Sequence, residues 1–287
     1  MQHHWLGYAA VLAILGGTVS AQTNTATAPE IEVRGLALKE AQAVGPYEQP
    51  EWTTVRRFPT TRVYLQKTPW EQGVEAWWRG RWYKDGTSKH RYETEYELGL
   101  PGRLQMDLYH AWLTDKAHIT KPEYASAELR YALADWGLIP LNPTLYGEAK
   151  YVWDGPNVLE GKLLLGDQLG QSIHWGVNFV WEEETGGERA RELAISHAAS
   201  YTLVDRRLSV GYELKYTQET VADDRANPAK SFGIGPSLQW RPTHNLHLDA
   251  VTLFGVSEDA PRIESYLVIG WDFGVTEKTP RAAIHNR

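Results

Sequence analysis

Three carboxylates stand at alternate positions of one segment: Glu93, Glu95 and Glu97. In an extended strand, residues two apart point to the same face, so these side chains would form a ladder on one side. Like charges at this spacing repel one another and need nearby cations. The ladder could therefore select cations in a water-filled path, or it could form one side of an interior ion-pair network.

Basic residues on neighbouring segments could compensate this ladder, and we expect Arg79, Arg81 and Arg103 to face it. Burying an unpaired charge costs several kcal/mol, so charges inside a narrow interior must be paired or hydrated. The candidate pore-lining residues are Arg79, Glu93, Glu95, Glu97, Arg103, Glu128, Arg130, Glu148, Lys150, Glu213 and Lys215. The same face is expected to carry Arg81, Lys162, Glu75, Asp107, Glu160, Glu182, Glu192, Glu219, Asp249, Glu264 and Asp272. Acidic residues are the majority, which favours cations if the interior conducts.

Catalytic and metal-binding arrangements are not evident. A serine nucleophile would have to share a strand face with a histidine, and neither His110 nor His197 has a serine two residues on. His244 and His247 lie at a turn and would diverge, so we expect no metal site. The chain has no cysteine, and its net charge of −7 argues against nucleic acid as a partner. We therefore predict a protein without enzymatic activity or cofactor.

The elements that must position these charges are long alternating segments. From Trp70 to Phe273, apolar and polar residues alternate over stretches of about ten to fourteen residues. Strands of soluble proteins usually run about five or six residues, whereas a strand that crosses a bilayer at a tilt needs about 9–11. The mean hydropathy of −0.46 agrees, because half of each barrel strand faces a polar lumen. The pattern predicts an all-β fold, an antiparallel transmembrane β-barrel.

Turn residues divide this region into about twelve strands, an even number as in single-chain bacterial barrels. The predicted strands are 72–83, 89–100, 103–114, 123–136, 144–153, 158–168, 173–183, 191–204, 208–220, 230–241, 246–257 and 262–273. Connections after even-numbered strands are mostly short, whereas those after odd-numbered strands, such as 115–122 and 221–229, are longer and more polar. Short periplasmic turns and longer external loops are typical of outer-membrane barrels.

Aromatic residues at the strand ends indicate a membrane independently. The chain has 13 Trp and 15 Tyr but 5 Phe, and amphipathic aromatics concentrate at membrane–water interfaces. The expected lipid face carries Trp136, Trp175, Trp240, Trp271 and Phe273 at the periplasmic ends and Trp82, Tyr92, Trp112, Trp153, Trp181, Tyr216, Phe232 and Phe254 at the external ends. Aliphatic residues such as Leu129 and Leu238 lie between these girdles. We predict location in the bacterial outer membrane; a soluble Trp-rich β-protein is the alternative.

The two ends of the chain are expected to differ from the barrel. Residues 1–21 predict a signal peptide, with an apolar stretch and small residues before Gln22. Residues 22–69 predict a periplasmic arm or a plug, residues 70–273 the transmembrane barrel, and residues 274–287 a periplasmic tail. The alternating apolar residues of the last strand resemble the signal that the outer-membrane assembly machinery reads, although a tail follows here.

The segment LRYALADWGLIPLNPTLY at 129–146 and KLLLGD at 162–167 resemble a group of bacterial outer-membrane β-barrels. In broad layout, this group is similar to the MetA-type channels of phenol-degradation pathways. The resemblance implies the barrel architecture and the passage of small, often hydrophobic compounds. It assigns no functional residue to this chain.

These observations favour a narrow channel or transporter in outer-membrane lipids that passes a small solute or ion. The charged face described above would then provide electrostatic selection and stiffen the pore. A closed barrel without transport activity, either structural or binding a partner through the loops at 115–122 and 221–229, is the alternative. An outer-membrane enzyme is disfavoured by the positions of the histidines.

Overall fold

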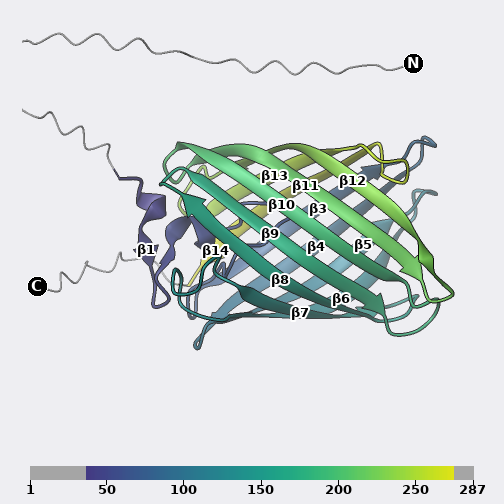
Figure 1. The fold of residues 1–287 in the computed structure, drawn as a ribbon, viewed down its shortest axis with the longest axis horizontal. Coiled ribbons are helices and arrows are strands. Elements are labelled where there is room, and N and C mark those ends of the chain that lie inside the picture. Colours follow the sequence, from purple (N-terminus) through teal and green to yellow (C-terminus); the bar gives the residue numbers. More distant parts are fainter. Residues whose placement is uncertain (1–36, 275–287) are drawn as a thin grey trace, which may run out of the picture. The chain divides into compact units, whose positions relative to one another are not determined.

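Twelve antiparallel strands close into a barrel in the computed structural model, which describes residues 37–274 (Figure 1). The strands are β3 (Gln72–Trp82), β4 (Ser88–Leu100), β5 (Leu104–Thr114), β6 (Thr120–Ala132), β7 (Thr144–Val152), β8 (Val158–Leu169), β9 (Ile173–Glu184), β10 (Arg191–Val204), β11 (Leu208–Val221), β12 (Asp224–Trp240), β13 (Leu246–Gly255) and β14 (Ile263–Phe273). Each strand pairs with its neighbours in sequence, and β14 closes on β3 from Ile263↔Trp82 to Phe273↔Gln72. The predicted fold class and strand number are confirmed. The predicted signal peptide, residues 22–36 of the predicted periplasmic arm and residues 275–287 of the predicted tail lie outside the described residues.

Two predicted boundaries differ from the structure by four residues or more. Residues 221–229 were expected to form an external loop, but β11 and β12 continue as a hairpin up to the pair Val221↔Asp224. Charged residues, alanines and a proline are mixed on both faces of this extension, so the regular alternation that marks a strand in lipid is missing there. Strand β6 ends at Ala132 instead of residue 136. Of the two loops through which a closed barrel was expected to bind a partner, only the one at 115–122 is therefore a loop.

The outer face of the barrel carries the predicted apolar belt. Trp181, Trp240, Trp271 and Phe254 are all more than 40% exposed. Exposure to this degree is expected of side chains that contact lipid. Trp136 is an exception, because it lies beyond β6 and its ring contacts Trp52 and Tyr64 edge to face. Trp136 therefore belongs to an interior cluster and not to the periplasmic girdle.

Residues 37–50 lie at one end of the barrel, against the short turns. They contain η1 (Lys39–Ala41) and the paired strands β1 (Ala43–Val44) and β2 (Gln49–Pro50), and β1 is seen at the left end of the barrel in Figure 1. The backbone N–H groups of Lys39 and Glu40 donate to Asp205 in the β10–β11 turn, and the Tyr47 carbonyl accepts from Trp136. Within residues 37–274, no helix has the length and hydropathy needed to cross a membrane.

Residues 51–68, here called the inner segment, lie within the barrel and begin with η2 (Glu51–Thr54). Their side chains and backbone make hydrogen bonds or ion pairs with β3–β6, β8–β12 and β14. Trp52, Phe58, Val63, Tyr64 and Leu65 are buried and form an apolar cluster with Ala132, Ala198 and Trp136. Burial of each such side chain contributes about 1.5–3 kcal/mol, so the inner segment is held by apolar contact as well as by charge.

Glycines in the wall allow this close approach. A Cβ atom at Gly176 would lie 2.6 Å from Val63 Cγ2, and one at Gly166 would lie 2.5 Å from Val63 Cγ1. At Gly99 a Cβ atom would lie 2.0 Å from the backbone oxygen of Thr68, where the chain leaves the lumen to begin β3. The wall residues at these positions therefore have to be glycine for the inner segment to fit.

Candidate functional site: the barrel lumen

The half of the lumen near the longer connections holds a cavity of about 540 Å³, here called the vestibule. Its mouth includes Gly155 and Pro156 of the β7–β8 connection, and its floor includes Pro59, Thr60 and Arg62 of the inner segment. Its charged lining residues are Arg79, Arg81, Arg91, Glu93, Glu123, Glu148, Lys150, Glu160, Lys162, Glu182, Glu184, Arg191, Glu192, Lys215 and Glu219. The vestibule is thus a polar chamber whose floor is a separate segment and not part of the wall.

One side of the vestibule is rich in arginine. Arg79 and Arg81 both bind the single carboxylate of Glu264, with Nε–Oε1 distances of 2.6 and 2.7 Å. Arg91 binds Glu123 through two hydrogen bonds, the bidentate geometry that strengthens such pairs. These arginines lie at alternate positions of β3 and β4, so the alternation of each strand aims them into the lumen.

The other side of the vestibule is rich in glutamate and is tied together by lysine. Lys150 Nζ lies 2.7 Å from Glu160, 2.6 Å from Glu182 and 3.7 Å from Glu148. Lys162 binds Glu160 at 2.8 Å, and Glu148 also accepts from Ser126 and Tyr146. The carboxylates of this side are therefore bridged by cations across β7, β8 and β9, an arrangement that stiffens the wall.

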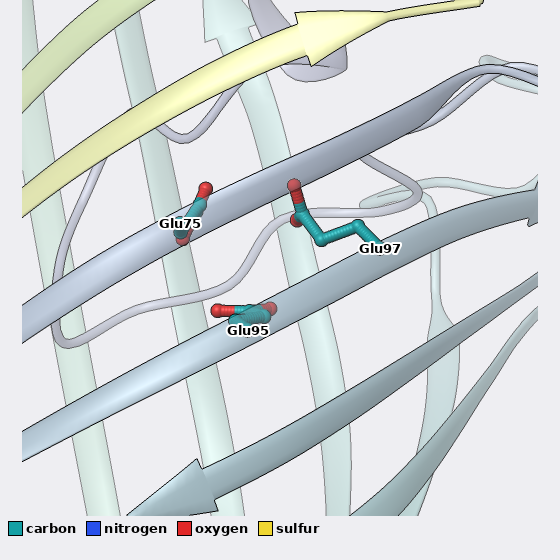
Figure 2. Close-up of side chains that lie close together, drawn as sticks. All are labelled: Glu75, Glu95 and Glu97. Carbon is teal, nitrogen blue, oxygen red and sulfur yellow. The ribbon is translucent and has the colours of Figure 1, made fainter.

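Below the vestibule floor, three carboxylates from β3 and β4 converge: Glu75, Glu95 and Glu97, here called the carboxylate cluster (Figure 2). One oxygen of each lies within 4.8 Å of the others, and all three side chains are buried. Three negative charges in a buried space this small repel strongly, so cations must accompany them.

The inner segment supplies those cations. Arg56 lies between the three carboxylates, with nitrogen–oxygen distances of 2.7 Å to Glu75, 3.1 Å to Glu95 and 3.7 Å to Glu97. Its guanidinium carbon lies 4.3 Å from the centroid of the Trp77 ring, a cation–π contact. Arg62 reaches Glu95 from the vestibule side at 3.4 Å. The carboxylate cluster is therefore occupied by side chains of the same chain.

Lys67 joins the carboxylate cluster to the last strand of the barrel. Its ammonium lies 3.0 Å from Glu97 and 2.6 Å from Asp272, and it is fully buried. Burial alone would lower the pKa of Lys67, but the carboxylates of Asp272 and Glu97 outweigh it and raise the pKa well above its ordinary value. Lys67 therefore stays charged and holds the end of the inner segment against β4 and β14.

A second buried network lies beside the first. Arg130 binds Glu128, Asp107 at 2.7 Å, and the side-chain oxygen of Gln66 in the inner segment at 2.6 Å. Glu213, on the opposite side of the lumen, accepts from the backbone N–H of Thr60 at 2.8 Å and from its hydroxyl. Arg130 and Glu213 both bind residues of the inner segment, and together they fix that segment in one position.

All but one of the predicted pore-lining residues fall into two groups. Arg79, Glu93, Glu148, Lys150 and Lys215 line the vestibule. Glu95, Glu97, Glu128, Arg130 and Glu213 are buried around the inner segment. Arg103 is in neither group. The structure brings ten of these eleven candidates into the lumen, at two levels along the barrel.

The prediction that Arg103 faces the lumen is wrong. It lies in the β4–β5 turn with φ +62°, and its guanidinium binds Asp135 at 3.4 Å and the Tyr131 hydroxyl at 3.4 Å. The expected compensation of the glutamate ladder is corrected as well, because Arg79 and Arg81 bind Glu264 instead. The cations that neutralise the lower part of the ladder are Arg56, Arg62 and Lys67. At its upper end, Glu93 accepts a hydrogen bond from Tyr124.

The prediction missed residues that the sequence could partly have revealed. Arg91 lies two positions before Glu93 and so shares its face. The same alternation places Tyr109 and Tyr124 inward, where their hydroxyls donate to Glu128 and Glu93. Lys67 and Arg56 carry no such signal, because the inner segment lacks regular alternation.

The histidines of the barrel wall contact aromatic or acidic side chains. His110 contacts the rings of Trp112 and Trp153 in the outer girdle, and His197 contacts Tyr212. His174 is buried and stacks on Trp52 with centroids 4.4 Å apart. His247 is buried and its Nδ1 lies 2.6 Å from Asp249. Among the described residues, these rings lie in different parts of the barrel and do not converge.

Comparisons with known proteins agree with this architecture. Residues 160–272 match the family described as "Putative MetA-pathway of phenol degradation", which confirms the resemblance found in the sequence. The NanC porin superposes with a TM-score of 0.49 and 12% identity over 71% of this chain and 100% of that one. An outer-membrane channel from Pseudomonas putida F1 gives 0.47 and 12% over 72% and 97%. The translocator domain of the autotransporter NalP from Neisseria meningitidis gives 0.42 and 10% over 72% and 90%. No curated protein matches the sequence.

The location of the protein follows from the barrel itself. A closed barrel with an even number of long antiparallel strands, an apolar outer face and aromatic girdles is the architecture of bacterial outer-membrane proteins. Lipid is therefore the environment of its outer face. The protein is therefore an outer-membrane β-barrel.

Proposed function

We propose that the protein is a narrow channel for a small solute or ion, and that the structure represents its closed state. The observation that carries the proposal is the vestibule, whose floor is formed by residues 59–62 of the inner segment. A barrel with only a structural role has no need of a polar chamber of about 540 Å³. In this proposal the inner segment acts as a plug, and conduction requires it to move.

The charge of the wall around the inner segment supports a preference for cations. Wall strands contribute Glu75, Glu95, Glu97, Asp107, Glu128, Glu213, Asp249 and Asp272 to this buried level. The basic residues of the same strands at this level are Arg130 and His247. If the inner segment moved away, these carboxylates would line a hydrated passage, and rings of acidic side chains select cations.

A closed structural barrel is the second candidate, and the ion pairs across β7, β8 and β9 favour it. Such a network can serve to stiffen an interior without any passage. The two candidates differ in one respect, since only the channel requires the inner segment to be displaceable. Orientation with the short turns in the periplasm and insertion by the outer-membrane assembly machinery are part of both proposals.

Planar-bilayer recording of the full chain and of Lys67→Met tests the channel. Methionine keeps the length of the side chain but removes the charge that binds Glu97 and Asp272. We expect rare conductance steps in the wild-type protein, longer openings in the variant, and reversal potentials in a salt gradient that indicate cation selectivity. Lys121→Met, at an exposed position outside these contacts, is the matched control. Absence of steps in both the wild-type protein and Lys67→Met would favour the structural barrel.

A further inference from the structure

The carboxylate cluster has the chemistry of a binding site for an organic cation. Glu75, Glu95 and Glu97 present their carboxylates to one buried space, as Figure 2 shows. Arg56 places a guanidinium in this space, and Lys67 brings an ammonium to its edge at Glu97. Both groups arrive from the inner segment and not from the wall that carries the carboxylates. The wall therefore recognises cationic groups that are carried on a separate piece of chain.

Two further features indicate that the space is built for a ligand. Glu75 Oε1 and Glu97 Oε1 are buried and have no hydrogen-bond partner among the described residues. The nearest cationic atoms recorded for them are His247 Nε2 at 3.5 Å and an Arg56 nitrogen at 3.7 Å. Buried polar atoms are seldom left without a partner. The side chains of the inner segment thus leave acceptors that another donor-rich cation could use.

The aromatic groups beside the cluster favour an organic cation over a metal ion. The Trp77 ring receives Arg56 on its face at 4.3 Å and Arg62 at 5.3 Å, and its Nε1 donates to Glu95 at 2.8 Å. Guanidinium and ammonium groups bind aromatic faces and carboxylates together, whereas a metal ion uses only the oxygen ligands. The combination of three carboxylates with an indole face is suited to a guanidinium or a primary ammonium.

We propose that small organic cations with guanidinium or primary ammonium groups bind the carboxylate cluster in place of Arg56 and Lys67, and thereby release the inner segment. This inference rests on the proposed channel and names the class of solute that opens it. Such a solute enters through the vestibule, where Arg62, Trp77 and Tyr109 form the part of the lining that contacts Glu95. The inner segment then acts as an internal competitor of the solute.

Agmatine, which carries one guanidinium and one primary ammonium group, is the probe. The full chain is recorded in planar bilayers with agmatine on the vestibule side, and tetramethylammonium or Ca²⁺ replaces it at equal ionic strength. We expect agmatine to raise the open fraction about tenfold, a common size for coupling between a ligand and a conformational change. We expect the ratio of open fraction with agmatine to open fraction without it to fall close to one in Glu95→Gln, because this variant lacks an acceptor for the guanidinium. Because Arg56 binds the same carboxylate, each protein is compared with its own agmatine-free value. Glu188→Gln, on an external connection away from the lumen, should respond as the wild-type protein does.

Labelling of a single cysteine provides a second measurement of the same event. Val55 is 2% exposed within the inner segment, and the chain has no native cysteine. In vesicles, Val55→Cys should react faster with a maleimide reagent in agmatine than in tetramethylammonium.

The outcomes separate this inference from the proposed channel. Conductance in Lys67→Met together with no effect of agmatine beyond that of tetramethylammonium would overturn the inference and leave the channel standing. An equal effect of Ca²⁺ would also overturn it, because the cluster would then respond to charge or bind a metal. Absence of conductance under every condition would overturn both.

Discussion

Replacement of Arg56 by methionine should weaken the docking of the inner segment on the carboxylate cluster. Arg56 is 1% exposed and lies within ion-pair distance of all three members of the carboxylate cluster. Methionine fills much of the same volume without the charge. In the variant, Glu75 and Glu95 lose their nearest cation while the inner segment still excludes water from them.

The magnitude follows from the cost of breaking a buried ion pair, about 3–5 kcal/mol when one partner is removed. Because β3 and β4 remain paired from Gln72↔Leu98 to Trp82↔Ser88, this cost acts on docking of the inner segment and not on barrel closure. Each 1.4 kcal/mol is a factor of ten, so the docked fraction should fall relative to the undocked fraction by about two to three orders of magnitude.

Single-channel recording measures this change directly as open fraction. Arg225→Met is the matched control, since Arg225 lies in the β11–β12 hairpin and binds the carbonyls of Thr220 and Arg189. Heat-modifiable migration on a gel checks that both variants form the barrel. An Arg56→Met barrel that folds and stays as closed as the control would show that Arg56 does not hold the inner segment in its docked position.

A charge-neutralising second substitution sharpens the same test. Glu95→Gln added to Arg56→Met removes one of the carboxylates left without a cation. Residues in one ion-pair network are energetically coupled, so the double variant should recover part of the closed fraction that Arg56→Met loses. Strictly additive effects of the two substitutions would show that Arg56 and Glu95 do not act on each other.

Two other predictions concern the edges of the lumen. Gly99→Ala should weaken the junction between the inner segment and β3 by about 1–3 kcal/mol, because the added methyl group would meet backbone atoms; faster proteolysis of the inner segment would measure this. Gly147→Ala, where a Cβ atom meets nothing within 4 Å, should leave the proteolysis rate unchanged, and equal rates for both variants would contradict the prediction. Arg103→Ala should not alter the reversal potential of open channels, whereas Lys150→Ala should increase cation selectivity; a shift of similar size in both would place Arg103 in the conduction path after all.

The barrel could be predicted from the sequence because its signal is periodic. Residues two apart share a face, so Glu93, Glu95 and Glu97 were placed in the lumen by alternation alone. Arg103 does not follow this rule because Gly102 and Arg103 both have positive φ and form the turn, where strand alternation does not apply. The error of one residue at the start of β5 thus changed the predicted direction of a charged side chain.

The cations that neutralise the carboxylate cluster could not be predicted, because they come from a segment without periodicity. The inner segment has one short helix, η2, at its start, and the rest of its backbone forms neither helix nor strand. Its position depends on long-range contacts such as Lys67–Asp272, which join residues far apart in the chain. Sequence alone therefore identified the acidic face but not the cations that occupy it.

A disulfide between the inner segment and the wall tests most directly whether movement of that segment opens the barrel. Val63→Cys with Gly176→Cys suits this, because a Cβ atom at Gly176 would lie 2.6 Å from Val63 Cγ2, an atom that Val63→Cys removes or replaces by the sulfur that forms the bond. We expect the oxidised double variant to show no conductance steps and a reducing agent to restore them. If oxidised protein with a verified crosslink conducts like its reduced form, then opening of the barrel does not require the inner segment to move.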